Sequence, residues 1–149
     1  MPDAGGGRGR DASPGSRPRS PASLLESARA LLTRSAAPYS RFRVAAALED
    51  ADAEVHPGVN VESASYGLSI CAERNALFGA ISRGASRFTR IALVSETMRP
   101  VVPCGACRQV LLEHAPDLTL ILERADGSPE QVRLSELLPR PFTEFQPKP

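Results

Sequence analysis

Cys71-Ala72-Glu73 and Pro103-Cys104-Gly105-Ala106-Cys107 contain all three cysteines of this chain of 149 residues. A closed structural zinc site takes four protein ligands, whereas a catalytic zinc site takes three and leaves the fourth position to water or substrate. Three cysteines therefore indicate a metal site with one open position. Glu73, two residues after the first thiol, is the candidate acid/base group beside it.

The spacing of the thiols supports a shared ligand set. Cys104 and Cys107 are three residues apart at the expected start of a helix, so both thiols face one side of it. Cys71 opens another expected helix, and a helix N-terminus lowers the pKa of a thiol. Two helix ends are therefore predicted to converge on one cation.

Three other interpretations of the cysteines remain open. Cys104 and Cys107 could form a redox pair, or all three cysteines could be ordinary buried residues. A structural zinc site completed by His56 or His114 is the third alternative. His114 lies seven residues past Cys107, about 10 Å along the same predicted helix, which makes it a poor fourth ligand.

The two stretches resemble the cytidine deaminase family, in which a glutamate that does not bind the metal follows the first ligand and Pro-Cys-x-x-Cys supplies the other two. The resemblance covers residues 23–142 and is closest to the small, single-domain branch that acts on free nucleosides. It extends through the flanking residues Tyr39-Ser40, Phe42, Asn60-Val61-Glu62, Arg74, Arg108-Gln109-Val110, Leu137-Leu138-Pro139 and Phe142. Val102 and Ala45 depart from the residues usual in that branch, Ser and Gly.

The pattern of apolar residues predicts an α/β fold in which strands alternate with helices. Helices are expected at 23–35, 69–83 and 104–113, and strands at 42–48, 55–61, 89–95, 118–122 and 131–134. Ser23 and Glu26 predict a capping box at the first helix, and residues 49–52 predict an acidic turn. The resemblance implies a single-domain, three-layer arrangement with a mixed five-stranded sheet flanked by helices.

Composition suggests one domain between two tails. Residues 1–22 contain no Leu, Ile, Val or Phe, so a disordered tail is expected there. Residues 23–143 form the expected catalytic domain, and residues 144–149 a short C-terminal tail. Because no stretch has the length and hydropathy of a membrane span or a secretion signal, a cytoplasmic location is expected, where thiols stay reduced.

Charge narrows the class of substrate. The chain has 18 Lys and Arg against 17 Asp and Glu, so it lacks the basic surface that nucleic-acid binding requires. A small neutral substrate, and no nucleic-acid or membrane partner, is therefore expected.

The resemblance implies a role for each candidate site residue. Cys71, Cys104 and Cys107 would bind one Zn²⁺ per subunit, and Glu73 would move protons to N3 of cytosine and to the departing amine. The backbone N–H of Ala72 would bind the pyrimidine O2, and Arg74 would hydrogen-bond the ligand sulfurs. Pro103, like Arg74, would lie around the metal ligands without binding the metal. The remaining substrate contacts implied by the family are Phe42, Asn60, Glu62, Tyr66 and Phe142.

Asn60 and Glu62 are implied to bind the ribose 3′-hydroxyl, and their i, i+2 spacing on an extended segment places them on one face. Phe42 would pack on the base or sugar, while Tyr66 and Phe142 would reach into a neighbouring subunit of a homotetramer. Each has a plainer alternative: a surface strand for the polar pair, a solvated arginine for Arg74, and core packing for the aromatics.

The function implied is zinc-dependent deamination of cytidine and 2′-deoxycytidine to uridine and 2′-deoxyuridine, with release of ammonia, in pyrimidine salvage. One alternative is a deaminase of a modified cytosine nucleoside such as a blasticidin-type antibiotic. Another, from a different class, is a non-catalytic zinc-binding scaffold, which would have no use for Glu73.

Overall fold

The structure is a computed structural model that describes residues 17–97 and 99–144. Its helices are α1 (Pro21–Arg29), α2 (Ala72–Ser82), α3 (Gly105–His114) and α4 (Leu134–Leu137). Its strands are β1 (Val44–Asp50), β2 (Val55–Val59), β3 (Phe88–Ser95), β4 (Thr119–Glu123) and β5 (Pro129–Arg133). The strands form one sheet in the order β2-β1-β3-β4-β5.

The sheet is mixed, as predicted. Strands β1 and β2, β1 and β3, and β4 and β5 pair antiparallel, whereas β3 and β4 pair parallel. The parallel pair needs a crossover connection, and α3 provides it between β3 and β4. The expected mixed five-stranded α/β fold is therefore confirmed.

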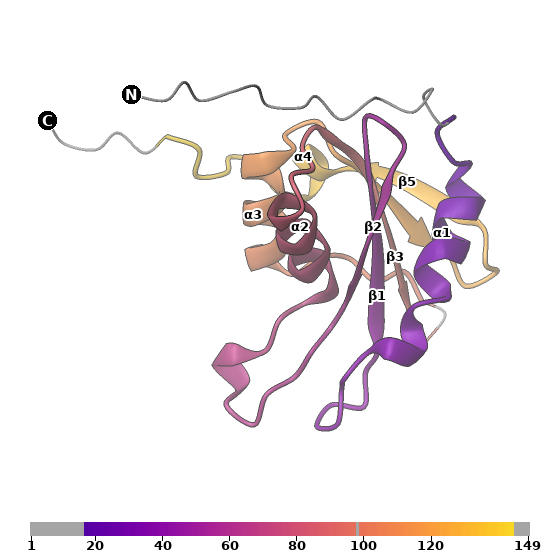
Figure 1. Ribbon diagram of the computed structural model, residues 1–149, viewed down its shortest axis with the longest axis vertical. Coiled ribbons are helices and arrows are strands. Elements are labelled where there is room, and N and C mark those ends of the chain that lie inside the picture. Colours follow the sequence, from indigo (N-terminus) through magenta and orange to yellow (C-terminus); the bar gives the residue numbers. More distant parts are fainter. Residues whose placement is uncertain (1–16, 98, 145–149) are drawn as a thin grey trace, which may run out of the picture.

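Helices cover both faces of the sheet and give three layers, with α1 on one face and α2 and α3 on the other (Figure 1). Along β1, Ala45 and Ala47 pack towards α1, while Val44, Ala46 and Leu48 belong to the core beneath α2 and α3. Because successive side chains of a strand point to opposite faces, both faces of this central strand are apolar.

The first helix begins earlier than the sequence pattern predicts. Its N-cap is Ser20, whose side chain accepts a hydrogen bond from the backbone N–H of Ser23, and Pro21 occupies the first turn. Proline suits that position because the first N–H groups of a helix have no intrahelical partner. The predicted capping box at Ser23 is therefore wrong, and α1 ends at Arg29, before a short 3-10 turn at Leu32–Arg34.

The predicted acidic turn at residues 49–52 is also wrong at its start, because Glu49 and Asp50 are buried members of β1. The guanidinium of Arg90 donates from Nε to Glu49 at 2.8 Å, and the two side chains form an ion pair. Asp50 Oδ2 lies 2.9 Å from Nε2 of the buried His56 on β2. Burial of these carboxylates is possible because each has a charged or hydrogen-bonding partner.

The tails lie mainly outside the described residues. Of the expected N-terminal tail 1–22, residues 1–16 are not described, and of the expected C-terminal tail 144–149, only residue 144 is described. Among the residues that the structure does describe, no helix has the length and hydropathy needed to span a membrane.

Candidate metal centre and active site

The three cysteines come together where two helices begin. Cys71 is the N-cap residue of α2, Cys104 is the N-cap residue of α3, and Cys107 lies in the first turn of α3. Their Sγ atoms all lie within 4.8 Å of one another, and those of Cys71 and Cys104 are 3.9 Å apart. Both helix dipoles therefore direct their positive ends towards this group of thiols.

The thiol cluster fits a zinc ion. Two sulfurs bound to one tetrahedral zinc at ~2.3 Å lie about 3.8 Å apart, close to the distance between Cys71 and Cys104. All three cysteines are free thiols. Neither histidine of the described chain belongs to the cluster, since His56 lies instead with Asp50 and Glu54. The site thus offers three protein ligands, which is the arrangement of a catalytic rather than a structural zinc site.

Hydrogen bonding within the cluster favours a thiolate at Cys71. The hydrogen bond from Cys107 lowers the pKa of Cys71 to about 5, with a further contribution from Arg74. The same hydrogen bond, together with burial, raises the pKa of Cys107. One shared proton between these thiols explains both directions, and a metal ion would displace it.

Arg74, three residues after Cys71 on α2, contacts the thiol cluster. Its Nη2 is 3.7 Å from Cys71 Sγ, and the hydrogen bond to this sulfur raises the pKa of the guanidinium. Its Nε is buried and has no hydrogen-bond partner in the described structure. This position does not fit the alternative of a solvated helix arginine, and the guanidinium is placed to offset part of the negative charge that metal-binding thiolates would carry.

Glu73 is nearly inaccessible, with 5% of its surface exposed, and it stands in the first turn of α2. Burial raises its pKa to about 7, with a further contribution from the neighbouring Cys71 thiolate. A carboxyl group with such a pKa can both accept and return a proton near neutral pH. Ala72, the first residue of the same helix, has an N–H that the helix itself does not use.

Asn60 follows β2 and binds the chain that enters β1. Its Oδ1 accepts from the backbone N–H of Val44 at 2.9 Å and from the hydroxyl of Ser35, while its Nδ2 donates to the carbonyl of Phe42 at 2.8 Å. A side-chain amide has two N–H donors and two acceptor positions. One N–H of Asn60 is left for another partner.

Glu62 holds the loop that precedes β1. Its Oε2 accepts the backbone N–H groups of Tyr39 and Ser40 at 2.9 and 3.1 Å, and its Oε1 accepts the Ser40 hydroxyl. The hydrogen bond from that hydroxyl is the main cause that lowers the pKa of Glu62. Three of about four acceptor positions of the carboxylate are thus occupied.

The three predicted aromatic contacts are exposed. The exposed fractions are 38% for Phe42, 75% for Tyr66 and 68% for Phe142. The alternative that they are core residues is therefore wrong. The rings of Tyr39 and Tyr66 meet edge to face with centroids 6.0 Å apart, so two separate loops present aromatic groups side by side.

Three polar residues near the site are missing from the sequence-based list. Arg108 donates from Nε to the carbonyl of Pro103 at 2.7 Å and from Nη1 to that of Leu137 at 2.9 Å, which fixes the loop before Cys104. Asn75 bonds the end of β2, and Ser40 bonds Glu62. The family resemblance includes Ser40 and Arg108 but implies no role for either, and no local sequence pattern indicates their hydrogen-bond partners.

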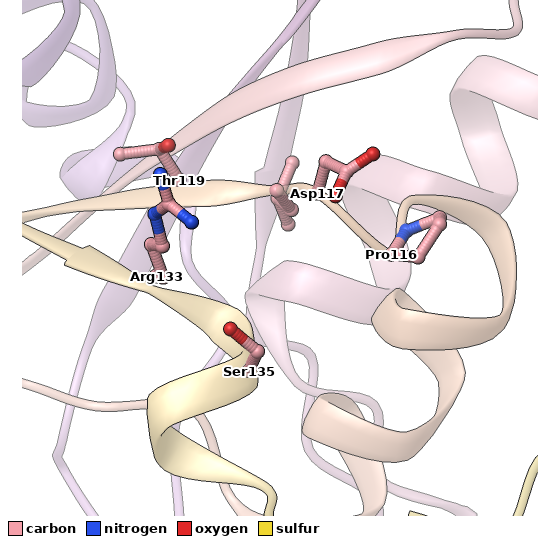
Figure 2. Close-up of a pocket in the computed structure, with 6 residues that line it drawn as sticks. Pro116, Asp117, Thr119, Arg133 and Ser135 are labelled. Carbon is pink, nitrogen blue, oxygen red and sulfur yellow. The ribbon is translucent and has the colours of Figure 1, made fainter.

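A separate pocket of about 270 Å³ lies at the other end of α3, after its last residue. Figure 2 shows its lining, which is Pro116, Asp117, Leu118, Thr119, Arg133 and Ser135. Thr119 and Arg133 are cross-strand partners on β4 and β5. None of the predicted site residues lines this pocket.

Three converging thiols with an open position, beside a buried carboxyl group, define the class of metal-dependent hydrolytic enzymes. Comparison with known proteins makes this specific. Residues 19–122 match the family model described as the cytidine and deoxycytidylate deaminase zinc-binding region. The chain belongs to this family.

Curated relatives and solved structures agree with that assignment. A cytidine deaminase of Halalkalibacterium halodurans is 52% identical over 71% of this chain and 81% of the relative. The crystal structure of a Burkholderia pseudomallei cytidine deaminase covers 80% of this chain and 97% of its own, with 46% identity and a TM-score of 0.76. For a Mycobacterium tuberculosis cytidine deaminase the coverages are 82% and 96%, with 38% identity and a TM-score of 0.72.

Proposed function

We propose that this protein is a zinc-dependent cytidine deaminase that converts cytidine and 2′-deoxycytidine to uridine and 2′-deoxyuridine. The observation that carries the proposal is the buried Glu73 beside a cluster of three thiols with an open fourth position. The activity named for the relatives supports the substrate class. Neither a modified nucleoside nor a non-catalytic scaffold is favoured by any of these relatives.

Cys71, Cys104 and Cys107 would hold the zinc ion, which supplies an acidified water as nucleophile when bound. Glu73 would accept a proton from the attacking water and transfer it to N3 of the pyrimidine as the C4–O bond forms. Glu73 then carries the second proton from the oxygen to the amino group, the C4–N bond breaks, and ammonia leaves. An acid/base group of this kind contributes ~10²–10⁴-fold to the rate.

The neighbouring groups would orient the base. The unused N–H of Ala72 donates to the pyrimidine O2, and the exposed ring of Phe42 packs against the nucleoside. Arg74 stabilises the thiolate ligands by its contact with Cys71 Sγ. These contacts bind and position the substrate, whereas Glu73 alone moves protons.

The hydrogen-bond inventory of Asn60 and Glu62 supports recognition of one hydroxyl group. Asn60 has one free N–H and Glu62 has about one free acceptor position. A hydroxyl both donates and accepts, so a ribose 3′-hydroxyl satisfies this pair. A 3′-phosphodiester cannot donate and would be repelled by the carboxylate, which favours free nucleosides over polynucleotides.

We also propose a homotetramer with shared active sites. Nine large apolar side chains of the described residues are exposed in the single chain, and contact with neighbouring subunits would bury part of this apolar surface. These side chains are Tyr39, Phe42, Val61, Tyr66, Leu68, Phe78, Ile81, Val102 and Phe142. Light scattering should then give about four times the chain mass of 15.9 kDa.

We propose that the chain consists of one catalytic domain between two tails. Residues 23–143 form the catalytic domain, together with the start of α1 at Pro21, and the two tails have no assigned role. We also propose a cytoplasmic location, where thiols stay reduced and can bind zinc.

Two measurements on the purified protein test the enzyme assignment. Metal analysis should give about one zinc per chain, and the ultraviolet band of cytosine should be lost as cytidine turns into uridine. Glu73→Gln should keep the zinc and the fold but lose about two orders of magnitude or more in turnover. Stoichiometric zinc with no turnover of cytidine or 2′-deoxycytidine would refute the proposal.

A further inference from the structure

The Tyr39–Phe42 loop, which leads into β1, has an unusual backbone. Arg41 has a positive φ of 55°, in the left-handed region that residues other than glycine adopt at a cost. Such a conformation persists only where surrounding contacts hold it. Three of the hydrogen bonds that hold this loop involve Ser40.

Ser40 makes three hydrogen bonds that connect two candidate substrate contacts. Its hydroxyl donates to Glu62 Oε1 and its backbone N–H donates to Glu62 Oε2 at 3.1 Å. The same hydroxyl oxygen accepts the backbone N–H of Phe42 at 3.0 Å. One serine thus joins the carboxylate of Glu62 to the backbone of Phe42.

The contacts of Ser40 also determine which part of Glu62 stays free. With the Ser40 hydroxyl on Oε1 and two backbone N–H groups on Oε2, the carboxylate cannot rotate without breaking several hydrogen bonds. The remaining acceptor position therefore has one fixed direction. Fixed direction gives selectivity, because a group that is held in place before binding loses little freedom when it binds.

We propose that Ser40 is a positioning residue that fixes the carboxylate of Glu62 and so determines selectivity for nucleosides with a free 3′-hydroxyl. This inference rests on the proposed function. Phe42 is less dependent on Ser40, because Asn60 Nδ2 holds its carbonyl from the other side at 2.8 Å. Loss of the Ser40 hydroxyl should therefore act mainly through Glu62.

The test compares cytidine with 3′-deoxycytidine in steady-state kinetics. Ser40→Ala should lower kcat/KM for cytidine about tenfold, mostly through a higher KM, because it removes a hydrogen bond to a charged acceptor. For 3′-deoxycytidine, which lacks the recognised hydroxyl, the fall should stay within about twofold. Binding of uridine and 3′-deoxyuridine, measured by calorimetry, reports the same discrimination without catalysis.

Matched variants separate positioning from general damage. Ser40→Thr keeps the hydroxyl and should retain the discrimination between the two substrates. Ser65→Ala removes an exposed hydroxyl before the 3-10 turn Tyr66–Leu68 and should leave kcat/KM unchanged for both substrates. In a Glu62→Ala background, Ser40→Ala should cause no further loss of discrimination, since the two residues act as one unit.

The outcomes distinguish this inference from the proposed function. A wild-type protein that fails to deaminate cytidine refutes the function, and the inference with it. A wild-type enzyme whose Ser40→Ala variant keeps full discrimination refutes the inference alone. Equal losses for both nucleosides, with Ser40→Thr no better, would reduce Ser40 to a structural residue of the loop and would also overturn it.

Discussion

Gly58→Ala should disturb α2, the helix that carries Glu73, because β2 and α2 pack so closely at Gly58 that no side chain fits between them. A Cβ atom at Gly58 would lie 2.2 Å from the carbonyl oxygen of Ala72, 2.5 Å from the backbone nitrogen of Ala76 and 2.7 Å from its Cβ. Ordinary contacts between carbon atoms are about 3.5–4.0 Å. The helix must therefore move by about 1 Å, since backbone atoms cannot rotate away.

The size of the effect follows from these contacts. Extra methylene groups in a packed core cost about 1–3 kcal/mol and sometimes more, and three fixed atoms around Gly58 put this substitution at about 3 kcal/mol. For a domain of this length, that loss lowers Tm by about 6–12 °C. Activity should fall too, because Ala72 lies between Cys71 and Glu73.

Thermal and urea unfolding of the metal-loaded protein measure the loss. Gly79→Ala is the matched control on the same helix, since its added Cβ meets only the guanidinium of Arg83, at 3.3 Å, which can move aside. That control should be neutral or stabilising by up to about 1 kcal/mol, because alanine favours a helix. If both variants unfold at the same temperature, the close packing of β2 on α2 is not the constraint described.

Asp50→Asn should lower stability by about 1–3 kcal/mol at pH 7. Burial alone would raise the pKa of Asp50, but the hydrogen bonds from His56 and from two backbone N–H groups outweigh it and lower the pKa below 3.8. The stability that this carboxylate contributes is present above pH 3.8 and is lost as pH falls through its lower folded pKa. In urea unfolding, the difference in free energy of unfolding between Asp50→Asn and wild type should therefore narrow by pH 3. A difference that stays constant would contradict this. Phe142→Ala should raise KM for cytidine about tenfold through a lost aromatic contact, because its side chain, 68% exposed in the single chain, is free to reach a neighbouring subunit's pocket; an unchanged KM would remove Phe142 from the site.

The metal cluster could be predicted because its geometry is local. Cys104 and Cys107 are one helical turn apart, and Pro103 and the N-cap position of Cys104 fix where that turn begins. Cys71 and Glu73 are also close in sequence, two residues apart at the start of α2. Each half of the site therefore needs only short-range information, and the apolar pattern of the strands brings the halves together.

Buried charge could not be predicted, because it depends on residues far away in the sequence. Glu49 and Asp50 are typical of an exposed turn until Arg90, 41 residues from Glu49, and His56 are placed against them. The start of α1 differs from the prediction because Ser20 and Ser23 both suit an N-cap. In the structure Ser20 caps the helix, with its side chain bonded to the N–H of Ser23 and Pro21 in the first turn.

Both site helices begin without a side-chain cap. The side chain of a serine, threonine, aspartate or asparagine normally accepts from the first free N–H groups of a helix, and replacing such a cap by alanine costs about 0.5–2 kcal/mol. Cys71 and Cys104 occupy the N-cap positions of α2 and α3 and make no such bond. In the proposed function their sulfurs would bind the zinc ion instead. Zinc bound only by the folded chain would link the folding equilibrium to free zinc through mass action. The zinc supply in the surroundings would then govern how much folded protein persists as well as how much is active.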